Sequence, residues 1–281
     1  MFCSVKLFDN DRINKIRLNY MSWTDIFKDK NILFSAISDL LLNEESLLYY
    51  ASQKESTKTL EDTKKYVKKL IDNNSLHTCM EDVLNCIGWN KDIDIYNTVF
   101  QGDLAEYLMN ILLDKFTSVD TIISKVSLKT SERMPVYGND NYFYDYDNGI
   151  LYFGESKFYS NFENAMKNAI ESIKKHSKYE EISFVRNHTT SIIAETGKQR
   201  TMLVEKFETI YMDDIQKKSI IFVVNEDIYK KEDYEQRMLN YFKKIEEINA
   251  ISEEILFVFL PVLSKEQFLQ YFKERLKEYG R

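Results

Sequence analysis

Hydrophobic and polar positions follow a helical period along the first third of the chain. Between residues 30 and 43 the apolar residues recur every three or four positions, which is typical of a helix with one buried face. The same pattern returns at residues 57–72 and 75–87. Residues 1–95 are therefore predicted to form a mostly helical N-terminal region.

The rest of the chain mixes helical periods with runs that are typical of strands. Two runs, residues 219–225 and 254–263, are almost entirely apolar, which is the pattern of a strand buried on both faces. A further strand is predicted at residues 120–128. Helices are predicted at residues 95–116 with an interruption near Gly102, at 161–176, at two places between 177 and 214, at 231–250 and at 264–279. This order predicts an α/β fold with a mixed sheet flanked by helices, and we assign residues 96–281 to that domain.

A β-hairpin is predicted in the middle of the chain. Aromatic residues crowd positions 141–146, an apolar run covers positions 150–153, and Asn148-Gly149 between them is a strong hairpin signal. A two-residue type I′ turn would pair Asp140 with Lys157. Because side chains alternate between the faces of a strand, Asp140, Glu155 and Lys157 would then share one face. A three-residue turn would shift the register by one residue and break this alignment.

These three residues are candidates for a metal site. Two carboxylates at such a distance can share a divalent metal ion, and a neighbouring lysine can orient or polarise a water molecule. The alternative is a solvated strand end with a surface ion pair, because the tripeptide Glu-Ser-Lys alone arises easily by chance in a charged chain. The position of the tripeptide, between an apolar strand and a predicted helix, favours the metal site.

Composition indicates a folded protein of a reducing compartment. The 281 residues are 44% hydrophobic and 14% aromatic, enough to build one large core or two smaller ones. No apolar run reaches the roughly 18 residues that suggest a membrane span, and the N-terminus lacks a signal-peptide pattern. Cys3, Cys79 and Cys86 form no Cys-x-x-Cys pair, which argues against a zinc site. We expect a cytoplasmic protein with no membrane segment.

The net charge bears on whether this chain can bind nucleic acid by itself. The chain carries 38 basic and 45 acidic residues, a formal net charge of −7. Proteins that hold nucleic acid by themselves use lysine and arginine to neutralise phosphates, so this balance is unusual for them. Either the chain does not act on nucleic acid, or a partner delivers the substrate.

Taken together, the motifs resemble two nested families. A meander with Asp…Glu-x-Lys on its second and third strands, then a helix and a buried strand, resembles the PD-(D/E)xK restriction-endonuclease-like core. Within that superfamily the chain is similar to the HamA family, the nuclease subunit of the bacterial Hachiman antiphage defence system, most specifically over residues 101–175. Asn139 stands before the aspartate where the family motif has proline. The similarity lies in Gly102-Asp103-Leu104-Ala105-Glu106, Lys125-Val126-Ser127-Leu128-Lys129-Thr130, Tyr137-Gly138-Asn139-Asp140 and Gly154-Glu155-Ser156-Lys157-Phe158-Tyr159.

The resemblance implies a Mg²⁺-dependent (or Mn²⁺-dependent) deoxyribonuclease. Asp140 and Glu155 would ligate the metal, with the backbone carbonyl of Ser156 as a third ligand. Lys157 would sit beside the attacking water and stabilise charge on the phosphate.

An auxiliary acid from the upstream helix is also implied. Glu106 fits the acid that many members of the superfamily place beside the metal, as a further catalytic and metal-binding residue. Asp103, three residues earlier on the same helix face, is the competing candidate. A glutamate on a helix surface is the alternative reading of Glu106.

HamA-like nucleases act with HamB, a superfamily 2 helicase. The resemblance therefore implies a HamB-like helicase partner that engages DNA while the acidic nuclease docks on it. Two other functions stay open. One is a non-catalytic regulatory or anchoring subunit with a nuclease-like fold; the other is an RNase or tRNase that uses the same metal site. The presence of Asp140, Glu155 and Lys157 together argues against the first, and no RNA-binding module supports the second.

Overall fold

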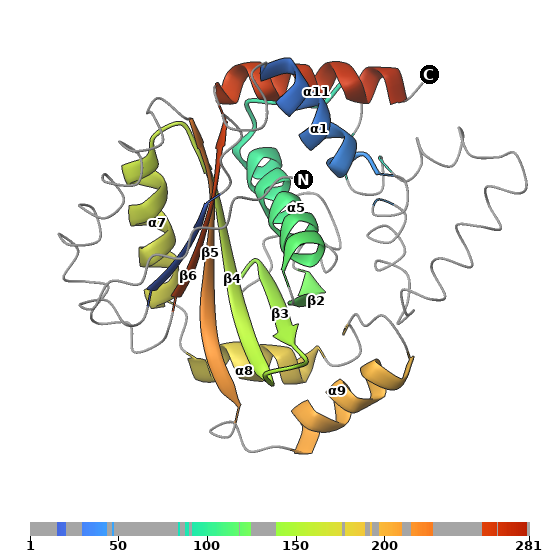
Figure 1. The fold of residues 1–281 in the computed structure, drawn as a ribbon, viewed down its shortest axis with the longest axis vertical. Coiled ribbons are helices and arrows are strands. Elements are labelled where there is room, and N and C mark those ends of the chain that lie inside the picture. The colour runs from blue at the N-terminus through green and yellow to red at the C-terminus, as the bar shows by residue number, and fades with distance from the viewer. Residues whose placement is uncertain are drawn as a thin grey trace, which may run out of the picture.

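A six-stranded mixed sheet crosses the molecule, with helices on both of its faces (Figure 1). The computed structural model describes residues 16–20, 30–43, 47, 84, 88–89, 92–117, 119–124, 139–175, 178–188, 192, 197–209, 215–226, 255–262 and 264–279. The predicted α/β class with a mixed sheet flanked by helices is confirmed. None of the described helices is both long enough and apolar enough to cross a membrane.

The strand order in the sheet is β1-β6-β5-β4-β3-β2. Strands β2, β3 and β4 form an antiparallel meander, whereas β4, β5, β6 and β1 run parallel to one another. The apolar runs predicted from the sequence are β5 and β6, and each has a parallel neighbour on both sides. The strands are β1 (Ile16–Tyr20), β2 (Asp120–Ser124), β3 (Asn141–Asp145), β4 (Ile150–Tyr159), β5 (Gln216–Glu226) and β6 (Ile255–Val262).

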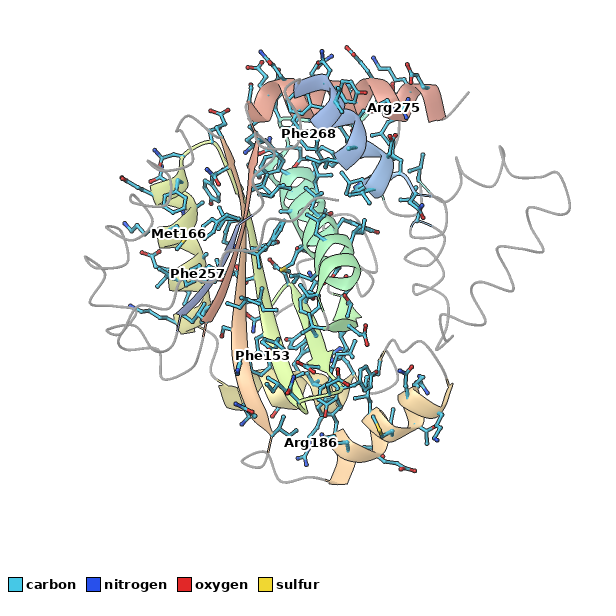
Figure 2. All side chains as sticks on the ribbon, viewed as in Figure 1. Phe153, Met166, Arg186, Phe257, Phe268 and Arg275 are labelled. Atoms are coloured by element: carbon cyan, nitrogen blue, oxygen red, sulfur yellow. The ribbon has the colours of Figure 1, made fainter. Side chains whose placement is uncertain are left out.

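Two separate apolar clusters cover the two faces. One contains side chains of α1, α5 and α11, and the other contains side chains of α8 and α9. Figure 2 shows Met166 on the sheet side of α7 and Phe268 where α11 meets α1; the Phe268 ring lies 5.6 Å from that of Phe34. The helices are α1 (Lys30–Leu41), α5 (Thr98–Phe116), α7 (Phe162–Lys175), α8 (Lys178–Asn187), α9 (Gly197–Thr209) and α11 (Lys265–Tyr279).

The hairpin is confirmed, but its turn is neither the two-residue nor the three-residue turn considered from the sequence. Asp145 pairs with Ile150, so four residues connect the strands. The reason is the Asp145 side chain, whose Oδ1 accepts hydrogen bonds from the backbone N–H groups of Asp147 and Asn148, at 3.0 Å each. The Gly149 N–H closes the turn by donating to the Asp145 carbonyl at 2.8 Å, with Gly149 at a φ of 68°.

The longer turn moves the register by two residues. Asn141 lies opposite Gly154, and one further step brings Asp140 next to Glu155, not next to Lys157 as a two-residue turn would have placed it. A shift of two residues leaves every side chain on its original face, whereas a shift of one would have reversed them. Glu155 and Lys157 therefore share a face as predicted, whereas the carboxylate of Asp140 lies at the strand edge, bonded to Ser156, whose side chain points to the opposite face.

The long helix α5 runs through Gly102 without a break, so the predicted interruption is wrong. Its first turn is capped by Asn97, whose side chain accepts a hydrogen bond from the Val99 N–H at 2.9 Å. Burial of the helix on the sheet outweighs the roughly 1 kcal/mol that a helical glycine costs.

The N-terminal part differs in one respect from a purely helical region. The helix predicted at residues 30–43 is α1, but β1 was not predicted and pairs in parallel with β6 at the edge of the sheet. The boundary between residues 95 and 96 stays a prediction, although β1 and α1 both contact elements beyond it. The helices predicted at residues 57–72, 75–87 and 231–250 lie outside the described residues, apart from Leu84, as does the predicted strand beyond Ser124.

Candidate active site

The site forms where β3 begins and β4 continues past it. The pairing of the two strands starts at Asn141 and Gly154, so the part of β4 beyond Gly154 has no β3 residue beside it. On its other side β4 stays paired with β5 up to Tyr159. Among the described residues, this part of β4, Glu155–Tyr159, therefore has no strand paired along one edge, which we call the open edge of β4.

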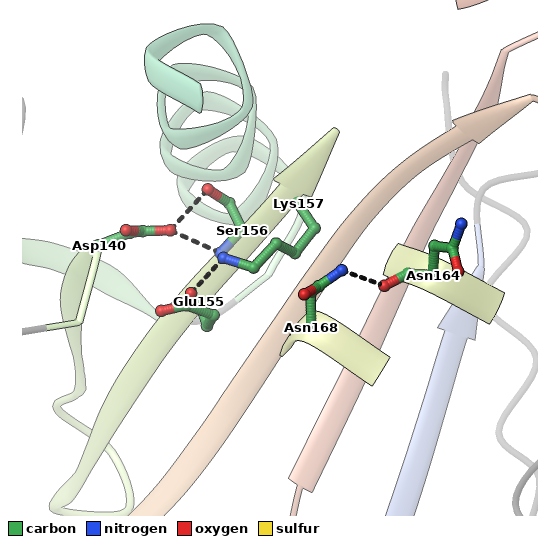
Figure 3. A network of polar contacts seen from close by, with 6 residues as sticks. All are labelled: Asp140, Glu155, Ser156, Lys157, Asn164 and Asn168. Atoms are coloured by element: carbon green, nitrogen blue, oxygen red, sulfur yellow. Dashed lines mark hydrogen bonds and ion pairs between the residues drawn. The ribbon is translucent and has the colours of Figure 1, made fainter. Parts of the chain in front are cut away.

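Asp140 occupies that open edge (Figure 3). Its backbone N–H donates to the Gly154 carbonyl at 2.9 Å. Its Oδ2 accepts two hydrogen bonds from Ser156, one from the backbone N–H and one from the hydroxyl, both at 2.8 Å. The carboxylate thus takes the place of a backbone carbonyl that β3 would supply if it were longer.

Glu155 and Lys157 point to the face of the sheet that α7 covers. They lie two residues apart on β4, and the Lys157 Nζ contacts Glu155 Oε1 as an ion pair. The Glu155 side chain is 4% exposed and the Lys157 side chain 20% exposed. The structure thus brings Asp140, Glu155 and Lys157 together, as the sequence analysis predicted, but it buries Glu155 rather than leaving it at a solvated strand end.

Burial and neighbouring charges shift the pKa values of both Glu155 and Lys157. Burial raises the pKa of Glu155 to about 7, and the negative charge of Asp140 adds to this, while Lys157 and a hydrogen bond from Ser172 partly oppose it. Burial by itself would lower the pKa of Lys157, but Glu155 and Asp140 reverse that effect and raise its pKa above the ordinary value. Lys157 is therefore the charged member of the pair, and Glu155 is the member that exchanges a proton near neutral pH.

Glu106 approaches from the other side of the sheet. Gly154 faces α5, where a Cβ on it would come within 3.1 Å of Met109 Cε, so the next residue, Glu155, faces away from that helix. The backbone carbonyl of Glu106 accepts a hydrogen bond from Asn141 Nδ2 at 3.4 Å, which holds this turn of α5 over the start of β3.

The carboxylates do not form a triad. Within the part of the chain that the structure describes, no three or more His, Cys, Asp or Glu side chains lie together in a group that could hold a metal ion. Glu106 is buried, but it is not gathered with Asp140 and Glu155, and neither is Asp103. The role of Glu106 as an auxiliary acid stays a prediction.

The residues present fit a hard divalent cation. Asp140 and Glu155 are both less than a tenth exposed, and the charge of Asp140 raises the pKa of Glu155, so the two carboxylates repel each other across a short distance. A cation between them would relieve this repulsion, and oxygen donors such as these are the ligands that Mg²⁺ and Mn²⁺ prefer. Two carboxylates are gathered among the described residues, so the further ligands that these residues can offer are carbonyl oxygens, such as that of Ser156, beside water.

The sequence analysis did not identify Ser172 of α7, which donates a hydrogen bond to Glu155. The only signal was a polar residue on the otherwise apolar inner face of an amphipathic helix, shared by many helices without any function.

The comparisons agree with the motifs. No curated protein matches the sequence. The HamA family matches over residues 6–276, nearly the whole chain, which includes the hairpin, Asp140 and the Glu155-Ser156-Lys157 segment. The chain therefore belongs to the HamA family and has a role in Hachiman antiphage defence.

Proposed function

We propose that this protein is a metal-dependent DNA nuclease of the PD-(D/E)xK type, which hydrolyses phosphodiester bonds as its part in antiphage defence. The observation that carries the proposal is the convergence of Asp140, Glu155 and Lys157 at the open edge of β4. Two buried carboxylates and a charged lysine are costly to keep in a fold and are typical of a site that handles charge.

The topology around these residues supports the same proposal. Helix α5 is followed by the meander of β2, β3 and β4 and by helix α7, the order that the PD-(D/E)xK resemblance implies. The parallel strand β5 comes next after two further helices, α8 and α9. The second strand of the meander is preceded by Asp140, and the third contains Glu155 and Lys157.

Asp140, Glu155 and the Ser156 carbonyl would hold Mg²⁺ or Mn²⁺. A bound ion supplies Lewis acidity at the phosphate and lowers the pKa of a water molecule. Ser156 fixes the orientation of the Asp140 carboxylate through two hydrogen bonds, so this ligand is positioned before any cation arrives. Preorganisation of this kind avoids reorientation during the reaction.

Lys157 would stabilise negative charge on the phosphate. Its raised pKa keeps the ammonium group protonated, and its partial exposure leaves it accessible to a substrate at the open edge of β4. Glu155 holds the ammonium group near the carboxylates, which places a positive charge beside two negative ones.

A HamB-like superfamily 2 helicase is the proposed partner. A net charge of −7 disfavours capture of DNA by this chain alone, since most non-specific affinity comes from neutralised phosphates. A helicase that binds DNA would bring the strand to the open edge of β4.

The test is a cleavage assay of the full chain, alone and with a HamB-like helicase, on DNA and RNA oligonucleotides with Mg²⁺. We expect metal-dependent cleavage of DNA that Glu155→Ala abolishes, while Glu274→Ala, at an exposed position of α11, leaves it intact. Preferential cleavage of RNA would identify a ribonuclease instead. No cleavage of either, with defence retained by Glu155→Ala in cells, would identify a non-catalytic subunit.

A further inference from the structure

Lys265, the first residue of helix α11, lies at the end of strand β4. Its Nζ donates a hydrogen bond to the backbone carbonyl of Phe158 at 2.9 Å. The same ammonium group lies 4.8 Å from the centre of the Phe158 ring and 6.0 Å from the centre of the Tyr159 ring. Phe158 directly follows Lys157 on β4, so Lys265 lies beside the candidate site although it is distant in the sequence.

The Phe158 carbonyl points to the open edge of β4. Successive residues of a strand direct their backbone N–H and C=O groups to opposite sides. The Gly154 carbonyl and the Ser156 N–H both bond to Asp140, which lies on the side of β4 away from β5 (Figure 3). Phe158 comes two residues after Ser156 and therefore faces the same edge. Lys265 occupies this edge beyond Asp140.

The carbonyls of Ser156 and Phe158 are neighbours along this edge. Two residues advance about 6.6 Å along a strand, so the two oxygens are separated by about that distance. The Ser156 carbonyl is a proposed metal ligand, and the Phe158 carbonyl holds the ammonium group of Lys265. A DNA strand with its scissile phosphate at the metal site, running along this edge, brings its next phosphate to Lys265.

The positive charge of Lys265 stands in an unfavourable place. Burial lowers its pKa, and the negative charge of Glu226 only partly opposes this effect. The Glu226 carboxylate accepts from the backbone N–H of Lys265 at 3.0 Å, and no carboxylate of the described residues forms an ion pair with the ammonium group. The positive end of the dipole of α11 also disfavours a cation in its first turn. A partly desolvated cation without a counter-ion is typical of a site that binds an anion.

We propose that Lys265 binds the DNA phosphate next to the scissile one, with its ammonium group fixed for that contact by the Phe158 carbonyl. The inference rests on the proposed nuclease function. Lysine has three ammonium hydrogens, and the carbonyl takes one of them. The side chain is half-buried, so the ammonium group is not sealed from a substrate.

A purely structural lysine, which only joins α11 to the end of β4, makes a contrary prediction. A lysine that binds phosphate releases counter-ions from the DNA, so its loss makes binding less dependent on salt. A hydrogen bond within the protein has no such effect. Lys265→Gln keeps a neutral donor and removes the charge, whereas Lys265→Arg keeps both.

The first experiment measures binding of a duplex oligonucleotide to the full chain in EDTA, by fluorescence anisotropy at several salt concentrations. We expect Lys265→Gln to bind more weakly and to lower the slope of log Kd against log salt by about 1, while Lys265→Arg keeps the wild-type slope. The matched control is Lys277→Gln, which makes the same change in net charge at an exposed position about 18 Å further along α11. We expect the wild-type slope there.

Cleavage gives a second readout. In the complex with a HamB-like helicase, Lys265→Gln should raise KM about fivefold and leave kcat within about twofold, because the phosphate that it binds is not the one that reacts.

A third measurement uses the wild type and so does not depend on the folding of a variant. Acetic anhydride acetylates lysine amines, and mass spectrometry measures the extent at each position. We expect the oligonucleotide to protect Lys265 severalfold and to leave the acetylation of Lys277 unchanged. Failure of Lys265 to react in the free protein would show that a phosphate has no access to it and would overturn the inference.

Three further results would overturn the inference while leaving the nuclease function intact. They are an unchanged salt slope in Lys265→Gln, an equal decrease of the slope in Lys277→Gln, and acetylation of Lys265 that DNA does not reduce. A lower melting temperature of Lys265→Gln together with the wild-type slope would identify the structural role. Absence of cleavage by the wild type, with Lys265 still protected by DNA, would instead remove the proposed function on which the inference rests.

Discussion

The carboxylate of Asp140 is bound twice by Ser156, through the backbone N–H and through the hydroxyl, with both donors 2.8 Å from the same oxygen. Asp140 precedes β3, and Ser156 stands between the two charged residues of β4. The two hydrogen bonds therefore join the separate halves of the candidate site. The bond from the Ser156 N–H also gives this backbone donor a partner at a strand edge, where β3 supplies none.

This relationship predicts that Ser156→Ala weakens the site without dismantling it. The hydroxyl bond to a charged group is lost, which should lower the free energy of unfolding by about 1–3 kcal/mol, while the backbone bond remains. Chemical denaturation measures the change. Asp140→Ala should cost more activity than Ser156→Ala, because it removes the carboxylate itself. Equal activity losses in the two variants would show that the serine hydroxyl has a role beyond orienting Asp140.

Glu155 predicts an unusual dependence of stability on pH in the metal-free protein. Its pKa is about 7 in the folded state against an ordinary 4.5. Below pH 4.5 both states hold the proton, so the group has no effect. Between pH 4.5 and 7 the folded state keeps a proton that the unfolded state has lost, so stability falls as pH rises. Above pH 7 the decrease in the free energy of unfolding is complete and amounts to about 3 kcal/mol.

Glu155→Gln removes this titration. The melting temperature of Glu155→Gln, compared with that of the wild type in EDTA, should rise progressively from about pH 4.5 to about pH 7 and then level off. Two proteins that differ at one residue share the titration of the groups that do not contact it, and Lys157, which does, has a pKa raised by Glu155. The difference between pH 4.5 and 7 therefore reports mainly on Glu155. A difference that does not vary with pH would mean that Glu155 is not desolvated.

Elements with a strong local pattern were predictable from the sequence, and elements fixed by tertiary contacts were not. Helices α7 and α11 and strands β5 and β6 follow directly from apolar periodicity or continuous apolar runs. Strand β1 is a short edge strand with polar Arg17 and Asn19, so its only support is the pairing with β6, distant in the sequence. The turn length depended on the hydrogen bonds of Asp145, which outweighed the Asn-Gly preference.

The candidate site was predictable only as far as the hairpin determines it. Alternation along β4 places Glu155 and Lys157 on one face in any register, whereas Asp140 joins them through its two hydrogen bonds to Ser156 at the strand edge. Ser172 depends on how α7 docks on the sheet, which no local pattern encodes. The place of Glu106 likewise depends on how α5 docks on the sheet, which no local pattern encodes.

Two glycines offer a matched pair of alanine substitutions. A Cβ at Gly154 would lie 2.7 Å from a ring carbon of Phe143 and 3.2 Å from the carbonyl oxygen of Asn141, which is backbone and cannot easily move. Gly154→Ala should therefore destabilise the protein by about 1–3 kcal/mol. A Cβ at Gly102 would meet no atom of the described residues within 4 Å beyond the backbone of α5 itself, so Gly102→Ala should stabilise by up to about 1 kcal/mol. Thermal unfolding should move in opposite directions for the two variants; a shift in the same direction would contradict the packing around Gly154.

Loss of either charged residue of β4 should abolish phage defence. Glu155→Ala removes a proposed metal ligand and Lys157→Ala removes the charge beside it, each with an expected rate loss of about 10²-fold or more. Lys157→Ala also leaves the buried Glu155 without its counter-ion, so some loss of stability is expected there. Plaque assays, with protein levels measured in the same cells, test this. Full defence in cells that contain folded Glu155→Ala protein would contradict the nuclease assignment.

The acidic balance predicts how the isolated chain behaves toward DNA. With a net charge of −7, long-range repulsion from the phosphate backbone slows encounter, and only local contacts at the site favour binding. Binding of a duplex oligonucleotide by the chain alone should therefore be weak and should fall steeply with salt, whereas the complex with the helicase should bind well. Docking on that partner should also restrain cleavage until the helicase engages its substrate. Fluorescence anisotropy at several salt concentrations measures DNA binding, and co-purification with a HamB-like helicase measures docking. Sub-micromolar duplex binding by the isolated chain at physiological salt, with no stable helicase complex, would show that this protein captures its substrate unaided.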